Sequence, residues 1–302
     1  MITRFAPSPT GKLHAGHAFS ALLAWHFSRR KTGKFVLRME DIDQQRCRPE
    51  FDDIMKQDLR WLGIQWADPV RHQSDHLAMY QSMADQLFDL GLLYPCFCTR
   101  REIQRELEAA GYAPQDNQPT AYPGTCRRLS ESEQQQRISA GHDYSLRLNV
   151  ERAVDRVGGN LIWNDLLNGP QPVQPDLLGD VILVRRDIGC SYHLCVTVDD
   201  ALQNITHVIR GEDLRDSTHV HRLLQALLDL PVPQYAHHPL IRGRDGVRLA
   251  KRLDSETLQS VREQGISAET FLKDSGLSDL LNDTLSQFAE ADDPPPQASP
   301  SP

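Results

Sequence analysis

The chain has 302 residues, of which 39% are hydrophobic and 25% are charged, and its formal net charge is -8. No run of about 18 apolar residues occurs, and the start Met1-Ile2-Thr3-Arg4 lacks the charged-then-apolar layout of a secretory signal, so we expect a cytoplasmic protein without a membrane-spanning segment. Six acids and no Lys or Arg lie from Asp274 onward, which leaves -2 for residues 1–273, so the bulk charge does not exclude a nucleic-acid partner.

The first 93 residues predict a β-α-β beginning. Residues 2–6 read as a strand, 16–30 as a helix with apolar residues at helical spacing, and 35–40 as a buried strand. Two more helices are expected over residues 51–62 and 76–90. This order is typical of an α/β fold with a doubly wound parallel, Rossmann-like sheet, and residues 1–93 would be its first half.

The composition changes at Tyr94, where a stretch rich in Gln, Arg, Pro and Gly begins, so we interpret residues 94–178 as an inserted subdomain. Strands expected over 180–184 and 205–209 and a helix over 217–228 indicate that the sheet resumes, which makes 179–252 its second half. Residues 253–288 are expected to form a short helical extension. The acidic, Pro-rich residues 289–302 are expected to be a disordered tail.

A candidate nucleotide site lies near the N-terminus, where Arg4-Phe5-Ala6-Pro7-Ser8-Pro9-Thr10-Gly11 runs into His14-Ala15-Gly16-His17. A strand that turns into a helix here directs backbone N–H groups and the helix dipole toward an anion. His14 and His17 can both face phosphate oxygens, and Gly16 lets an adenine ring approach the backbone. A His-x-x-His pair alone more often caps a helix, but the string that precedes it favours a nucleotide site.

The second candidate element is Arg248-Leu249-Ala250-Lys251-Arg252, which follows Gly243-Arg244-Asp245-Gly246. Lys251 can stabilise negative charge on a reacting phosphate, and the two glycines allow such a loop to close. A solvated basic loop is the simpler interpretation of this string taken alone.

Three of the six cysteines, Cys96, Cys98 and Cys126, form a candidate zinc site, because three thiolates and one further donor satisfy a tetrahedral ion. The spacing leaves the fourth ligand open, and three unrelated reduced cysteines are the alternative. We expect no disulfide framework in a cytosolic chain, and Cys47, Cys190 and Cys195 are expected to be small core or surface residues.

Together, the early and late strings resemble the two signatures of class I aminoacyl-tRNA synthetases of the glutamyl/glutaminyl branch, over roughly residues 4–255. Met39-Glu40-Asp41-Ile42-Asp43 and His207-Val208-Ile209-Arg210-Gly211-Glu212-Asp213 add to this resemblance. The late string departs from the usual Lys-Met-Ser-Lys-Ser pattern at Arg248 and Ala250 and keeps Lys251. The resemblance implies ATP and Mg²⁺ as partners, with catalytic roles for His14, His17 and Lys251 and ATP contacts from Thr10, Gly11, His14, Gly16, His17 and Lys251.

The same resemblance implies a glutamate site. Arg4 and Arg210 would bind the side-chain carboxylate, Glu40 the α-ammonium group, and Tyr192 would add a hydroxyl contact. The implied glutamate-binding set is Arg4, Phe5, Ala6, Pro7, Ser8, Glu40, Tyr192 and Arg210. It also implies that Tyr122, four residues before Cys126, is the fourth donor of one structural Zn²⁺ held by Cys96, Cys98, Tyr122 and Cys126 in an acceptor-binding-like subdomain.

Only 51 residues follow Lys251, where a glutamyl-tRNA synthetase carries a large anticodon-reading domain. This layout resembles the glutamyl-queuosine tRNA(Asp) synthetase family. The resemblance implies that glutamate is activated with ATP and esterified to the queuosine base in the anticodon of tRNA(Asp). Nothing in the sequence requires more than a monomer.

Two alternatives stay open. The chain could charge the 3′ end of tRNA(Glu) as a truncated synthetase, or it could be a non-catalytic zinc protein that binds tRNA. Transfer of glutamate to tRNA separates the two acceptors, and ATP–pyrophosphate exchange separates both enzymes from the binding protein.

Overall fold

The structure is a computed structural model that describes residues 1–109, 122–174, 177, 179–241 and 256–293. Its first part is a parallel β-α-β-α-β unit made of β1 (Ile2–Phe5), α1 (Ala15–Arg29), β2 (Lys34–Met39), α2 (Pro49–Trp61) and β3 (Ala67–His72). The long helix α3 (Leu77–Asp89) follows. The predicted first strand, the second strand and the three helices are confirmed within two residues at each end, and β3 was missed.

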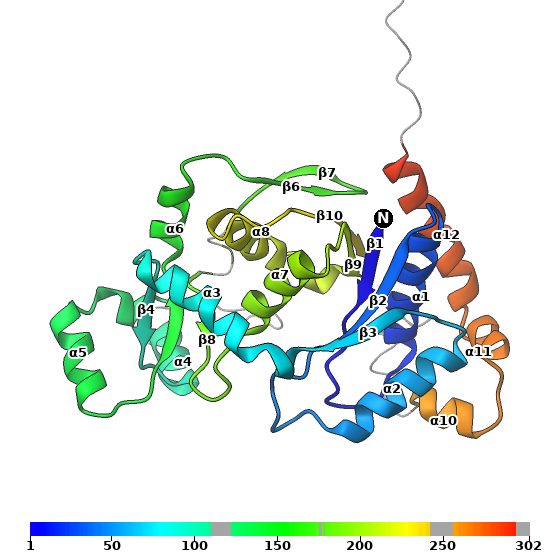
Figure 1. The fold of residues 1–302 in the computed structure, drawn as a ribbon, viewed down its shortest axis with the longest axis horizontal. Coiled ribbons are helices and arrows are strands. Elements are labelled where there is room, and N and C mark those ends of the chain that lie inside the picture. The colour runs from blue at the N-terminus through cyan, green and yellow to red at the C-terminus, as the bar shows by residue number, and fades with distance from the viewer. Residues whose placement is uncertain (110–121, 175–176, 178, 242–255, 294–302) are drawn as a thin grey trace, which may run out of the picture.

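A second sheet has the order β7-β6-β10-β9, from β6 (Ile162–Asp165), β7 (Gly169–Pro172), β9 (His207–Gly211) and β10 (Gln234–His238). Strands β6, β10 and β9 run parallel, and β7 is antiparallel at the edge. The backbone N–H of Thr206 donates to the carbonyl of Ile2, so β9 begins beside β1 (Figure 1). The two parallel sheets therefore meet at β1 and β9, with α7 (Tyr192–Leu202) and α8 (Ser217–Leu227) completing the second half.

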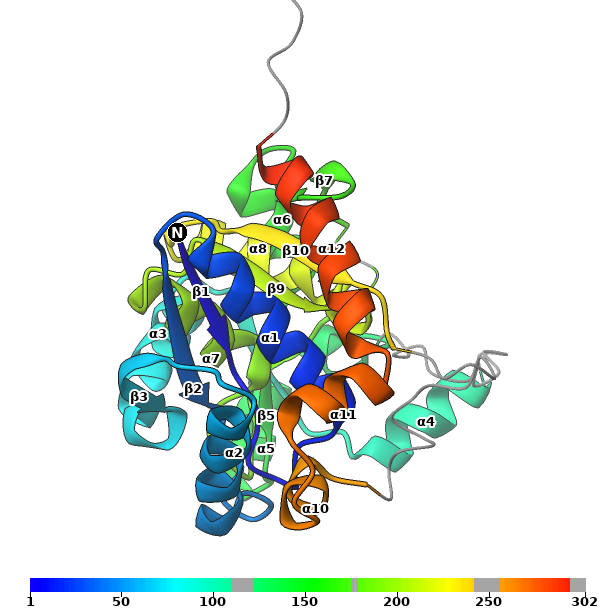
Figure 2. The ribbon, with the colours of Figure 1, turned by 90° about the vertical axis from the view of Figure 1, so that its right-hand side faces the viewer.

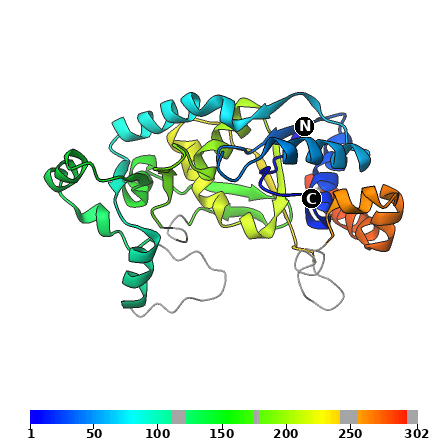
Figure 3. The same ribbon diagram turned by 90° about the horizontal axis from the view of Figure 1, so that it is seen from below.

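The third sheet is antiparallel and has the order β4-β5-β8, from β4 (Leu93–Cys96), β5 (Ser145–Leu148) and β8 (Ile182–Val184). It lies with α4 (Arg100–Ala109), α5 (Glu131–Ser139) and α6 (Val150–Val157) at one end of the molecule (Figures 1 and 3). The expected strand at 180–184 is therefore confirmed, but its assignment to the resumed parallel sheet is wrong.

Strands β6 and β7 show the opposite error, because residues 162–172 fall within the expected insertion and yet pair with β10. Pairing partners far apart in sequence are not visible in local hydrophobic patterns. Strand β8 therefore belongs to the sheet of the inserted part, and the hairpin β6–β7 belongs to the sheet of the second half.

The C-terminal part consists of α10 (Leu258–Glu263), α11 (Ala268–Asp274) and α12 (Leu277–Asp292). Helix α12 lies along α1 (Figure 2), and Phe288 packs edge-on against Phe27. Lys31 forms an ion pair with Asp292 at 2.8 Å, and His207 on β9 hydrogen-bonds to the same carboxylate at 3.3 Å, so both residues hold the end of α12 against the rest of the fold. The expected disordered tail at 289–302 is therefore wrong for residues 289–292, while residues 294–302 lie outside the described part.

None of the helices in the described ranges combines the length and the apolar character that crossing a membrane requires. The main core lies between the first sheet, α1 and α12, and a second core joins α3, α7 and α8 to the antiparallel sheet.

Candidate active site

A pocket of about 390 Å³ lies where β1, β2 and β9 end and α1 begins. Carboxyl ends of parallel strands are where open α/β sheets bind ligands. The pocket brings together nine residues that the sequence predicted from separate strings. They are Arg4, Phe5, Ala6, His14, Gly16, His17, Glu40, Tyr192 and Arg210.

Four predicted residues do not line this pocket, namely Pro7, Ser8, Thr10 and Gly11. Ser8 and Thr10 are exposed in the loop between β1 and α1. The Pro7 carbonyl accepts a hydrogen bond of 2.9 Å from the backbone N–H of Glu40, so this loop fixes the start of the segment after β2. Lys251 lies outside the described residues.

The N-terminus of α1 is built from the two predicted imidazoles. His14 Nδ1 accepts from the backbone N–H of Gly16 at 3.1 Å, and His17 Nδ1 accepts from the backbone N–H of His14 at 3.3 Å. Each neutral ring therefore carries its proton on Nε2. Burial, followed by the effect of His14, lowers the pKa of His17 to about 4, so His17 acts at neutral pH as an uncharged donor.

Gly16 has a steric role in this arrangement. A Cβ atom added there would lie 3.0 Å from the His14 ring, so a side chain at position 16 would displace that imidazole. The helix therefore caps itself with a histidine, as the simpler interpretation of the His-x-x-His pair expected, and that ring also lines the pocket. Its contact with a nucleotide stays a prediction.

Arg4 and Glu40 belong to a buried network of charges. Arg4 Nε lies 3.2 Å from Asp200 Oδ1, and Arg38 Nη1 lies 2.9 Å from the same oxygen. Arg38 also pairs with Glu40 Oε1 at 3.4 Å and is fully buried. Burial raises the pKa of Glu40 to about 6, although Arg38 and Arg4 oppose the shift.

Arg210 is also buried, and the side chains in the described residues that hydrogen-bond to it are uncharged. Its guanidinium donates to Thr218 Oγ1 at 2.7 Å, His237 Nε2 at 3.2 Å, and both Tyr192 Oη and His221 Nδ1 at 3.4 Å. Within the described ranges, no carboxylate forms an ion pair with Arg210. A buried guanidinium in a ligand pocket with only neutral partners favours an anionic ligand.

The sequence interpretation missed several pocket residues, which are Ser20, Ile209, Gly211, Asp213, Leu214, His238, Leu240 and Ile241. Ser20 Oγ lies 2.8 Å from His238 Nε2, which connects α1 with the end of β10. A polar residue at the end of a parallel strand was the available signal for His238. Ser20, one helical turn after Gly16, could have been found from helical spacing.

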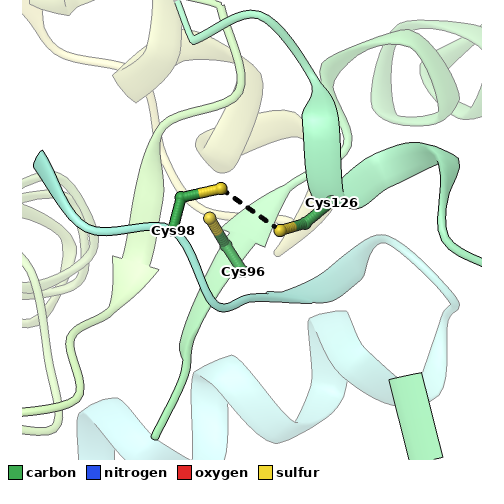
Figure 4. A group of neighbouring side chains, drawn as sticks. All are labelled: Cys96, Cys98 and Cys126. Carbon is green, nitrogen blue, oxygen red and sulfur yellow. Dashed lines mark hydrogen bonds between the residues drawn. The ribbon is translucent and has the colours of Figure 1, made fainter. Parts of the chain in front are cut away.

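The three predicted cysteines lie together between β4 and the 3-10 turn Thr125–Arg128 (Figure 4). Their sulfur atoms are all within 4.8 Å of one another. The Tyr122 hydroxyl is 3.4 Å from Cys96 Sγ and 3.5 Å from Cys98 Sγ. Backbone N–H groups also donate into the cluster, from Phe97 to Cys126 Sγ and from Cys126 to Tyr122 Oη. These cysteines could hold a metal ion, and Tyr122 is placed beside them.

Cys190 and Cys195 are both buried, as expected of core residues, but the structure joins them in a disulfide. The expectation of separate residues is wrong because Cys190 lies two residues before α7 begins at Tyr192 and Cys195 lies in the first turn of that helix, which brings the two residues together.

Comparison with known proteins agrees with this fold. Residues 1–290 match the family model for the catalytic domain of class I tRNA synthetases (E and Q), and the chain belongs to this family. A protein named Glutamyl-Q tRNA(Asp) synthetase from Rhodobacter capsulatus is 45% identical over 88% of this chain and 96% of its own length. A protein of the same name from Symbiobacterium thermophilum is 42% identical over 88% of this chain and 83% of its own length.

The chain is also similar to part of longer proteins named as glutamate–tRNA ligases. A Glutamate–tRNA ligase from Aquifex aeolicus is 39% identical over 88% of this chain, which spans 54% of that protein. The crystal structure of a glutamate tRNA ligase from Elizabethkingia meningosepticum, in complex with its amino acid, is 29% identical with a TM-score of 0.69. The match covers 85% of this chain and 53% of the crystallised one.

Proposed function

We propose that the chain activates L-glutamate with ATP and transfers the glutamyl group to queuosine in the anticodon of tRNA(Asp). The observation that carries the proposal is the single pocket that two buried guanidinium groups, one buried carboxylate and the imidazole-bearing N-terminus of α1 all line. Arg210 and Arg4 match the side-chain carboxylate of glutamate, and Glu40 matches its α-ammonium group. The relatives named Glutamyl-Q tRNA(Asp) synthetase support the choice of acceptor.

In the first step, a glutamate α-carboxylate oxygen attacks the α-phosphorus of ATP. The bond from that phosphorus to the bridging oxygen breaks, and pyrophosphate leaves. His14 and His17 would donate from Nε2 to phosphate oxygens, since their Nδ1 atoms accept backbone hydrogen bonds. Lys251, outside the described residues, would neutralise charge on the leaving pyrophosphate, and Mg²⁺ would enter as the partner of ATP.

In the second step, a hydroxyl oxygen of the queuosine cyclopentenediol attacks the carbonyl carbon of the mixed anhydride. The bond between that carbon and the phosphate oxygen breaks, AMP leaves, and an ester forms with loss of the hydroxyl proton. Because AMP is a good leaving group, we assign no general base to this step.

The cysteine cluster would hold one structural Zn²⁺ through Cys96, Cys98, Cys126 and Tyr122. Donors about 2.3 Å from a shared tetrahedral centre lie about 3.7 Å apart. The Cys98–Cys126 sulfur separation of 3.4 Å and the Tyr122 contacts are close to that spacing. Metal analysis of protein purified without chelators should find about one Zn²⁺ per chain, and less than half an equivalent would contradict the site.

The proposal is tested by transfer of labelled glutamate, with ATP and Mg²⁺, onto purified tRNA(Asp) with and without queuosine. We expect label only on the queuosine form. Absence of label on both forms would rule out the proposed acceptor.

A second candidate is a ligase that charges the 3′ end of tRNA(Glu), which the similarity to the Aquifex aeolicus Glutamate–tRNA ligase favours. The same assay with tRNA(Glu) tests it. Failure on all tRNAs, together with no glutamate-dependent pyrophosphate exchange, would instead indicate a binding protein.

A further inference from the structure

Asp165, His237 and Arg210 lie on three neighbouring strands, and hydrogen bonds connect their side chains in that order. His237 on β10 is the register partner of Arg210 on β9, and Asp165 on β6 is the register partner of Tyr235, two residues before His237. His237 Nδ1 lies 2.8 Å from Asp165 Oδ2, and Arg210 Nε lies 3.2 Å from His237 Nε2. The side chains of Asp165 and His237 are 0% and 1% exposed, and neither lines the pocket.

The direction of each hydrogen bond follows from donor chemistry. A guanidinium has no acceptor, so Arg210 Nε must donate and His237 Nε2 must accept. The ring proton of His237 then lies on Nδ1 and points at the Asp165 carboxylate. Thr218 Oγ1 accepts from Arg210 and lies 3.3 Å from the same Nε2, to which its hydroxyl can donate. The histidine is thereby held neutral, in one tautomer and one orientation.

The ionisation of the pair agrees with this assignment. Burial is the main cause that lowers the pKa of His237 to about 4, so the ring is neutral at pH 7. Burial alone would raise the pKa of Asp165, but hydrogen bonds from His237 and Asn168 outweigh it and lower that pKa. A carboxylate and a neutral imidazole are thus the stable combination.

We propose that Asp165 and His237 form a positioning dyad that aims Arg210 into the pocket and thereby determines selectivity for a carboxylate ligand over its amide, glutamate over glutamine. This inference rests on the proposed function, since it concerns the amino acid bound there. Neither residue lines the pocket in which the ligand would bind. Their role is to supply Arg210 Nε with an acceptor that carries no charge, so that the guanidinium keeps its full charge for the ligand.

Asp165→Asn is the most informative substitution. Asp165 Oδ1 already accepts from the backbone N–H groups of Leu167 and Asn168 and from the Asn168 side chain. An asparagine would keep its oxygen there and turn its NH₂ group toward His237. Nδ1 would then have to accept, the ring proton would move to Nε2, and two donors would face each other at Arg210.

The experiment compares D165N, H237F, H237Q and the control H219N with the wild-type chain. H237F keeps a ring and removes the acceptor, whereas H237Q retains an acceptor near the position of Nε2. His219 is a second buried histidine of this region, but it accepts from Trp163 and from the Gln174 backbone and does not contact Arg210. The readouts are calorimetric binding of L-glutamate and L-glutamine, KM and kcat in pyrophosphate exchange, and the ¹⁵N imidazole spectrum.

In D165N and H237F we expect glutamate affinity to fall about tenfold or more, with kcat changed far less, and the preference for glutamate over glutamine to fall by a similar factor. H237Q should recover most of that preference, and H219N should keep it. The His237 signal, assigned by its loss in H237Q, should change from the Nδ1–H to the Nε2–H tautomer in D165N.

Unchanged preference in D165N and H237F would overturn the dyad, as would equal losses in H237F, H237Q and H219N, which would indicate a merely structural role. These outcomes leave the proposed function standing if the wild-type chain prefers glutamate. A wild-type chain that binds neither amino acid would instead overturn the proposed function, and the dyad with it.

Discussion

Arg4 on β1 and Arg210 on β9 are both buried at the same pocket, but their guanidinium groups have different kinds of partners. Arg4 forms an ion pair with Asp200, and that carboxylate also pairs with Arg38. Among the residues that the structure describes, the hydrogen-bond partners of Arg210 are hydroxyl groups and imidazoles. One guanidinium is therefore part of a network of opposite charges, and the other has no carboxylate partner in the described part of the chain.

This difference separates structural support from ligand binding. Removing one partner from a buried ion pair leaves an uncompensated charge, which costs stability. Removing a buried guanidinium that has no counterion costs little stability but takes away the attraction for an anion. The network around Asp200 should therefore matter more for stability, and Arg210 should matter more for glutamate binding.

The largest effect is expected for Asp200→Asn, which breaks the charge network. Arg4 and Arg38 would lose their shared carboxylate, and the free energy of unfolding should fall by about 3–5 kcal/mol. Thermal denaturation should show a Tm lower by roughly 5–15 °C. The control is Asp155→Asn on the exposed face of α6, which should leave Tm unchanged. Equal Tm values for both variants would refute the network's structural role.

Arg210→Leu should have the converse effect. We expect kcat/KM for glutamate in pyrophosphate exchange to fall about 100-fold, because a charged hydrogen-bonding partner of the ligand is lost. Tm should stay the same or rise, since a buried unpaired charge is removed. Arg222→Leu on α8, where the guanidinium donates to the Ile162 carbonyl, is the matched control for activity. A fall in Tm as large as that of D200N would show that Arg210, like the network around Arg4, contributes to the stability of the fold.

The pH dependence of kcat/KM for glutamate tests the role of Glu40, which belongs to the charge network and also lines the pocket. Burial raises the pKa of Glu40 to about 6 against the effects of Arg38 and Arg4, while Asp200 and Asp199 add to the rise. Protonation below pH 6 removes the charge that would bind the α-ammonium group. We expect kcat/KM for glutamate to be level between pH 7 and 8 and to fall about tenfold from pH 7 to pH 5. A profile that stays level to pH 5 would contradict the role of Glu40.

Local patterns were sufficient to predict much of the fold. Helices α1, α2, α3 and α8 and strands β1 and β2 follow from apolar periodicity within single segments. Strand β7 could not be predicted this way, since Gly169-Pro170-Gln171-Pro172 lacks the apolar alternation of a strand and sits at a sheet edge, where proline is tolerated. The pairing of β8 with β5 depends on contacts far apart in sequence.

For the candidate site too, the sequence identified the residues in contiguous strings and missed those that only folding brings near. Arg4, His14, His17, Glu40 and Arg210 lie in contiguous strings, so residue type and spacing identified them. The residues that hold them were not identified, because Asp200, Asp165 and His237 become neighbours of the pocket only through folding. Asp165 was moreover expected in the insertion, so no local signal could connect it with Arg210.

The smallest effect is expected for Tyr192→Phe, which measures how much a weaker partner of Arg210 contributes. Tyr192 Oη accepts from Arg210 at 3.4 Å, a longer contact than that of Thr218 Oγ1 at 2.7 Å. Losing one marginal hydrogen bond should raise the glutamate KM by about twofold to tenfold, with kcat little changed. Thr218→Val removes the shorter contact and should raise KM more. The decisive result is which of the two variants has the higher glutamate KM. A higher KM for Y192F would mean that the Tyr192 hydroxyl acts mainly by contacting the ligand, as the resemblance implied, and not by orienting Arg210.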